Sequence, residues 1–180
     1  ALSESELEAI FSLDLKAHPE GYQKARQLFL IGAYSGLRFS DYKRITPNMI
    51  EEISGTLVIK IIAIKTKKLT IVPISSKLKA VLEECNNQSP DLSEQKLNEY
   101  IKEIGRLAGI NQGVTKTEFR GKEIKEIHLP KHQLIASHTA RRTFITLVKE
   151  NGMPNKLIME ITGHSSEGQI NLYDNPRICI

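Results

Sequence analysis

The sequence predicts an α+β domain that is mostly helical and carries a small antiparallel sheet. Most of the 180 residues fall into segments with helical periodicity, and two β-branched runs are joined by a short basic loop. Because these runs pair locally and helices return after them, the pattern favours α+β over a βαβ arrangement. We see no internal repeat and no low-complexity tract, so we expect one domain over residues 1–180.

Two helices are predicted to open the chain. In residues 2–15, Ser3 and Glu6 have the spacing of a capping box, and apolar residues then follow with helical periodicity. A second helix is expected between Pro19 and Gly36, because proline suits the start of a helix and glycine the position after its end.

The middle of the chain changes character. Residues 39–45 predict a short helix entered through Ser40, and residues 56–64 and 69–74 predict a hairpin whose tip is the basic stretch "KTKK". Helical periodicity then returns. The remaining elements are expected to be helices at 75–87 and 93–110, a second hairpin around Gly121 within 115–130, and helices at 139–151, at 154–162 and after Ser166.

Composition excludes several classes of protein. Hydrophobic residues make up 40% and charged residues 26%, as in soluble globular domains. The net charge of +4 permits a polyanionic partner without requiring one. Cys85 and Cys179 form no metal-ligand spacing, which favours a reduced, intracellular setting, and neither a membrane span nor a signal peptide is expected.

Two basic stretches have positions that suit anion chemistry. In "SGLRFSD", Arg38 lies at a junction between two predicted helices, where its guanidinium can grip a phosphate through two hydrogen bonds, or form a cap or an ion pair with Asp41. At the hairpin tip, Lys65, Lys67 and Lys68 can form a solvated turn, or one of them can donate a proton to a departing oxygen. Lys65 is the best placed of the three, because it lies at the strand end.

Two later stretches add histidines and a tyrosine. In "SHTARRTF", the i and i+3 spacing of His138 and Arg141 puts both on one face of a helix start, although a cap and a salt bridge are alternative roles. In "ITGHSSEGQINLYDNP", His164 occupies the turn after a helix, and Ser166 and Gln169 have capping-box spacing. Tyr173 follows about two turns later, where simple packing is the alternative to a chemical role.

Taken together, these cationic groups suit a phosphodiester whose developing charge the protein must neutralise. The sequence shows no metal-binding carboxylate cluster and no glycine-rich nucleotide loop. A tyrosine has a reference pKa of about 10, so a nucleophilic tyrosine needs nearby arginines and a group that accepts its proton.

The order of these motifs resembles the tyrosine recombinases, or phage integrase family. The likeness covers nearly the whole chain, and "KEIHLPKHQLIASHTARRTFITLVKENGMP" with "IMEITGHSS" is most similar to integrases of conjugative and mobilisable transposons. The resemblance implies a site-specific recombinase in which Tyr173 attacks a DNA phosphate and forms a 3′-phosphotyrosine. It assigns phosphate clamping to Arg38 and Arg141, the leaving-group proton to Lys65, proton transfer at the tyrosine to His138, and a hydrogen bond to the phosphate to His164.

The same resemblance implies neither a cofactor nor a catalytic metal. It implies double-stranded DNA at recombination sites as the partner and a homotetramer on DNA, with accessory excision or DNA-bending proteins and a bacterial cytoplasmic, nucleoid-associated location. Residues 1–180 correspond to the catalytic domain, and the amino-terminal core-binding domain of the family is expected to be absent from this chain. Two alternatives stay open: a type IB topoisomerase-like relaxing enzyme and a non-catalytic DNA-binding module.

Overall fold

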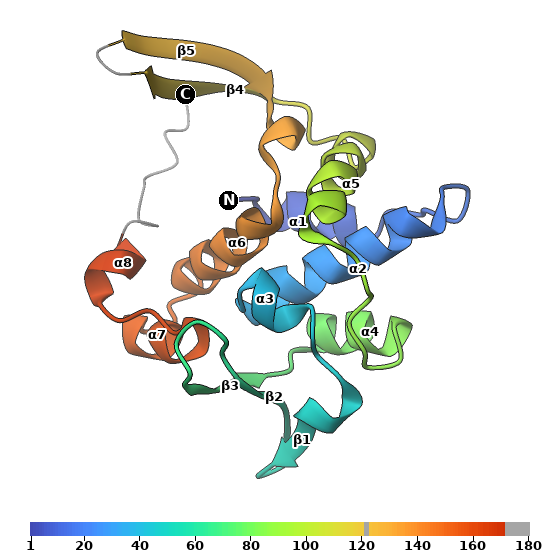
Figure 1. Ribbon diagram of the computed structural model, residues 1–180, viewed down its shortest axis with the longest axis vertical. Coiled ribbons are helices and arrows are strands. Elements are labelled where there is room, and N and C mark those ends of the chain that lie inside the picture. The colour runs from blue at the N-terminus through green and yellow to red at the C-terminus, as the bar shows by residue number, and fades with distance from the viewer. Residues whose placement is uncertain (121–122, 172–180) are drawn as a thin grey trace.

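The computed structural model describes residues 1–120 and 123–171, and it confirms the α+β prediction (Figure 1). Helix α2 (Glu20–Ser35) forms the centre, and its residues 25–33 are all buried. Helices α4 (Ser76–Glu84), α5 (Glu94–Leu107) and α6 (Ser137–Glu150) all pack against it. Because the middle of α2 is buried on all sides, it forms the core against which the surrounding helices pack.

The first helix, α1 (Glu4–Phe11), begins with the predicted capping box. Ser3 Oγ accepts the N–H of Glu6 at 3.2 Å, and the Glu6 carboxylate accepts the N–H of Ser3 at 2.6 Å. The N–H of the buried Leu2 donates to Thr143 Oγ1 of α6 at 2.9 Å. The start of the chain is therefore fixed to the helix that carries two of the predicted site residues.

The three-stranded sheet has the order β1-β2-β3 and is antiparallel throughout. Strands β2 (Thr56–Ile62) and β3 (Leu69–Pro73) confirm the predicted hairpin, but β2 ends two residues earlier than expected. The reason is that the N–H of Ile64 donates to a side chain, the carboxylate of Asp41, and not to the neighbouring strand. Strand β1 (Ile50–Ile53) was not predicted, because its "IEEI" pattern does not alternate.

The short helix after α2 lies within the predicted range 39–45 but ends three residues early and has a different N-cap residue. α3 (Phe39–Tyr42) takes Arg38 as its extended N-cap residue and is not entered through Ser40. Gly36 ends α2 with a φ of +68°, and a β-carbon there would lie 2.3 Å from the Phe144 ring. Only glycine fits this turn without strain, so the backbone that leads into Arg38 is narrowly defined.

The second predicted hairpin is also confirmed. Strands β4 (Gly113–Arg120) and β5 (Glu123–Pro130) pair antiparallel and extend away from the helical body, and the predicted turn residue Gly121 lies outside the described residues (Figure 1). The remaining elements are the 3₁₀ helices η1 (Pro47–Met49) and η2 (Lys131–Leu134), and the helices α7 (Asn155–Thr162) and α8 (Glu167–Asn171).

One predicted cap is wrong in detail. The side chain of Gln169 accepts the N–H of Ser165, one residue before the predicted partner Ser166. Within the described parts of the chain, none of the helices combines the length and the apolar character that a membrane crossing requires.

Candidate active site

Arg141 lies at the centre of the predicted site, in the second turn of α6, and only 3% of it is exposed. Its Nη1 donates to the carbonyl of Gly36 at 2.9 Å, and its Nη2 donates to the carbonyl of Thr162. These carbonyls lie at the carboxyl-terminal ends of α2 and α7, where the helix dipoles favour a cation. The guanidinium therefore joins three helices and is held in one orientation.

His164 lies directly beside this guanidinium. Arg141 Nη2 is 3.3 Å from His164 Nε2, and Thr162 Oγ1 is 2.7 Å from His164 Nδ1. Gly163 places the ring there, because its φ of +66° turns the chain out of α7. Burial, followed by the nearby Arg141 and then Arg38, lowers the pKa of His164 to about 4, so this ring is neutral at neutral pH.

The hydroxyl of Thr162 indicates the tautomer of that ring. This hydroxyl donates its single proton to the carbonyl of Ile158, so it can only accept from His164 Nδ1. Neutral His164 then carries its proton on Nδ1, and Arg141 Nη2 lies 3.3 Å from Nε2 and 3.4 Å from Nδ1.

Four of the six predicted site residues line one cavity of about 370 Å³. They come from the α2–α3 junction, the tip of the β2–β3 hairpin and the start of α6. Two other polar residues of this wall are bonded to each other, because Ser137 Oγ donates to the Glu94 carboxylate at 2.6 Å. The predicted residues in the cavity are Arg38, Lys65, His138 and Arg141.

Arg38 and His138 face this cavity in a state suited to an anion. Among residues 1–120 and 123–171, neither side chain makes a hydrogen bond or an ion pair, so the alternatives of an Arg38–Asp41 pair and a His138 cap are not realised. Burial, followed by the charges of Arg141, Arg142 and Arg38, lowers the pKa of His138. A neutral imidazole can accept a proton, while the guanidinium stays charged.

His164 lines an adjoining hollow of about 820 Å³ between β3 and α7. The Arg141–His164 contact joins the two hollows, so five of the six predicted residues form one continuous group. Lys65 lines the first hollow and Lys68 the second. This placement favours Lys65 over Lys68 as the lysine that acts beside the arginines.

The sixth residue, Tyr173, lies outside the described residues. The helix that leads toward it, α8, begins close to its predicted position, and its Ile170 is fully buried against α6 and α7. Asn155 Nδ2 of α7 also donates to Asn171 Oδ1 at 3.4 Å. The segment before Tyr173 is thus anchored on α6, which carries His138, and on α7, which ends just before His164.

Sequence reasoning missed a positioning residue, Asp41, and considered it only as an ion-pair partner of Arg38. Its carboxylate is 1% exposed, accepts the N–H of Ile64 at 2.8 Å and lies 3.6 Å from Arg44 Nη2. Arg44 Nη2 also donates to the carbonyl of Ile62. These contacts fix the base of the hairpin tip to α3. The only signal in the sequence was an acidic residue in a short predicted helix.

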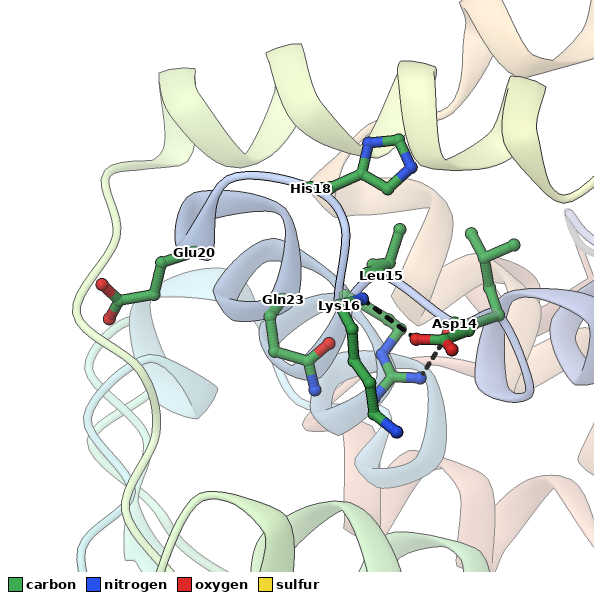
Figure 2. Close-up of a pocket in the computed structure, with 8 residues that line it drawn as sticks. Asp14, Leu15, Lys16, His18, Glu20 and Gln23 are labelled. Carbon is green, nitrogen blue, oxygen red and sulfur yellow. Dashed lines mark hydrogen bonds between the residues drawn. The ribbon is translucent and has the colours of Figure 1, made fainter.

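A further hollow, of about 480 Å³, lies at the α1–α2 connection, and none of the predicted site residues lines it (Figure 2). Its guanidinium, from Arg26, donates to the carbonyls of Phe11 and Leu13 and to the Glu84 carboxylate. One of the two dashed lines near Asp14 joins its carboxylate to the N–H of Lys16, which it accepts, and the labelled side chains do not converge on one point. These polar groups hold a loop in place and do not form a second reactive centre.

Comparison with models of protein families identifies the family of the chain. The model of the phage integrase family matches residues 1–177. The chain belongs to the phage integrase family. None of the curated proteins matches it at a significant level.

Solved structures of family members share the fold of this integrase-family chain. XerH recombinase bound to its difH substrate in a pre-cleavage complex is 19% identical, with a TM-score of 0.65 over 94% of this chain and 48% of XerH. Lambda integrase bound to a COC′ core site is 16% identical, with a TM-score of 0.66 over 99% of this chain and 60% of the other.

The integrase of transposon Tn1549, in complex with a circular intermediate DNA, is also 16% identical. Its TM-score is 0.64, over 96% of this chain and 60% of the transposon integrase. The chain thus spans about half to three-fifths of the length of the solved chains it matches. At these identities the likeness shows a shared fold.

Proposed function

We propose that this chain is the catalytic domain of a site-specific recombinase that cuts and rejoins DNA through Tyr173 and integrates or excises a mobile element. The observation that carries the proposal is the cavity in which Arg38, Lys65, His138 and Arg141 meet, although they lie up to 103 positions apart in the chain. Family membership supports it, and so do the DNA complexes formed by XerH, lambda integrase and the Tn1549 integrase.

In the proposed reaction, the phenol oxygen of Tyr173 bonds to the scissile phosphorus and the bond from phosphorus to the 5′ oxygen breaks. Lys65 gives a proton to that oxygen, and His138 takes part in removing the proton of the phenol. Arg38 and Arg141 hold the non-bridging oxygens as charge builds. A preorganised donor of this kind is typically worth ~10²–10³ in rate.

A fixed, charged Arg141 beside a neutral His164 suits this chemistry. Arg141 cannot swing away from an incoming phosphate, because the carbonyls of Gly36 and Thr162 hold it. His164 is neutral in the DNA-free protein and lies beside Arg141, where an arriving phosphate counters the effect of the arginines and favours a donated hydrogen bond.

As partners we propose double-stranded DNA and further copies of the chain, in a tetramer like that of lambda integrase bound to a Holliday junction, together with accessory excision or DNA-bending proteins. We place the activity in the bacterial cytoplasm, at the nucleoid. Binding should weaken strongly with salt, because phosphate contacts dominate the affinity of such complexes.

The first experiment tests for the covalent intermediate. A nicked attachment-site duplex should trap the wild-type chain as an adduct that denaturing electrophoresis resolves, and Tyr173→Phe should bind the same DNA without forming it. Equal adduct with both proteins would exclude Tyr173 as the nucleophile. Adduct with neither would favour the non-catalytic DNA-binding module.

The second experiment tests the role of Lys65. A substrate with sulfur at the bridging 5′ position has a leaving group that needs no proton, so Lys65→Ala should be defective on the oxygen substrate and restored on the sulfur one. Lys67→Ala serves as the matched control, because Lys67 lines neither hollow of the site. An equal defect of Lys65→Ala on both substrates would contradict the general-acid role.

A third assay separates recombination from topoisomerase chemistry. A recombinase joins two DNA sites into new products, whereas a type IB topoisomerase-like enzyme relaxes one supercoiled duplex. We expect joined products with attachment-site DNA, and relaxation alone would favour the second enzyme class.

A further inference from the structure

The hydroxyl of Thr66 lacks a partner although it is buried. Thr66 lies at the hairpin tip, directly after Lys65, and its Oγ1 is screened from solvent with no hydrogen bond among the described residues. Buried polar groups are almost always paired, because an unpaired one forfeits its bonds to water without replacement. A donor held in this state beside a candidate active site needs a physical reason.

Two hydrogen bonds hold the backbone of the tip in a closed turn. The N–H of Ala63 donates to the carbonyl of Lys68 and the N–H of Lys67 donates to the carbonyl of Ala63, both at 2.9 Å. Lys67 has a φ of +56°, which closes the turn. Because threonine is branched at its β-carbon, its side chain has few alternative rotamers in such a fixed turn.

The closed turn directs Thr66 toward the predicted phosphate-binding groups. A β-carbon on Gly163 would lie 3.8 Å from Thr66 Oγ1 and 3.5 Å from Arg38 Nη1, so both side chains approach the same point of the chain. Thr66 and His164 also line the same hollow of about 820 Å³. The hydroxyl of Thr66 and the guanidinium of Arg38, which has no described partner, thus both approach Gly163, the turn residue directly before the second histidine.

We propose that Thr66 is a further phosphate-binding residue, whose Oγ1–H donates to a non-bridging oxygen of the scissile phosphate held by Arg38. This inference rests on the proposed function, and it adds a residue to the site that the motifs did not indicate. The hydroxyl transfers no proton in this role, because it only stabilises charge on the phosphate. The hydroxyl has no partner in the free protein and would gain a charge-assisted hydrogen bond in the complex with DNA.

The test measures both stability and activity of one variant, and the two are expected to change in opposite directions. Thr66→Val keeps the shape and removes the hydroxyl, so its melting temperature should equal or exceed that of the wild type. Its rate of Tyr173 adduct formation on a nicked attachment-site duplex should fall about 10- to 100-fold, as expected for a lost hydrogen bond to a charged group. Thr66→Ser, which retains the hydroxyl, should recover most of the rate.

Thr56→Val is the matched control, because Thr56 is exposed at the opposite end of the same hairpin. It should change neither the melting temperature nor the adduct rate. A rate of Thr66→Val equal to that of the wild type would overturn the inference. A clear loss of melting temperature in that variant would also overturn it, since the hydroxyl would then be bonded in the free protein.

A substrate with sulfur at one non-bridging position, prepared as separate stereoisomers, locates the contact. Sulfur accepts hydrogen bonds weakly, so the Thr66→Val penalty should shrink for one stereoisomer and persist for the other. An equal penalty on both would show that the hydroxyl does not touch this phosphate. Failure of the proposed function is distinguishable, because the wild-type chain would then form no adduct at all, and the inference would fall with it.

Discussion

Replacement of Asp41 should disconnect the hairpin tip from the rest of the site. The Asp41→Ala change removes the acceptor for the N–H of Ile64 and leaves Arg44 without its buried carboxylate. A hydrogen bond to a charged acceptor is worth about 1.5–3 kcal/mol, and the half-exposed arginine adds little. We therefore expect a loss of about 2 kcal/mol in the free energy of unfolding, measured by urea denaturation.

Activity measurements should show whether the contacts of Asp41 position Lys65. Because Lys65 directly follows Ile64, the Asp41→Ala variant should form adduct slowly on the oxygen substrate and regain much of its rate with 5′-bridging sulfur. Asp14→Ala is the matched control: its carboxylate also accepts a backbone N–H, at 3.0 Å, but on an exposed loop. If Asp41→Ala unfolds like the control, or if sulfur gives it no recovery, the positioning role is wrong.

The other predictions concern a turn and a histidine. Gly36→Ala should destabilise the fold by about 2–4 kcal/mol in calorimetry, since its β-carbon would meet the Phe144 ring at 2.3 Å and its φ is +68°. Gly152→Ala, with a φ of +80° but open space around it, should cost only about 1 kcal/mol, and equal losses would contradict the steric argument. His164 has a pKa of about 4 when folded and near 6.5 when unfolded, so the unfolded chain binds more protons between these values. The free energy of unfolding should therefore fall as the pH drops from 6.5 toward 4, by about 1 kcal/mol after allowance for solvent screening. His164→Gln should flatten this dependence in urea titrations at pH 7 and 4.5, and an unchanged slope would exclude His164 as its source.

Local signals predicted the elements well where a cap or a glycine marked their ends. The capping box of Ser3 and Glu6 forms as predicted, and Gly36 and Gly163 end their helices in the left-handed conformation. These features depend on interactions within a few residues, which a sequence displays directly. Strand β1 was missed because pairing with β2, and not its own pattern, makes it a strand.

The site was predicted from the order of motifs, whereas its supports depend on contacts between distant segments. The motifs named the residues that meet in the cavity around Arg141. They did not indicate Asp41 as the clamp of the hairpin tip, because its partner Ile64 is 23 positions away and bonds through its backbone. Nor did they indicate Thr66, whose unpaired hydroxyl approaches Gly163, 97 positions away in the chain, only in the folded protein.

The two arginines have a second effect that follows from the same geometry. In the DNA-free protein, burial and then the arginine charges keep the pKa values of His138 and His164 low, so both rings are neutral at neutral pH. A bound phosphate would offset those charges and raise both values. Under the proposed mechanism, the arginines thus clamp the phosphate and also keep His138 neutral and able to accept a proton. The bound phosphate, by raising the pKa of His138, makes it a stronger base for the phenol proton when Tyr173 attacks.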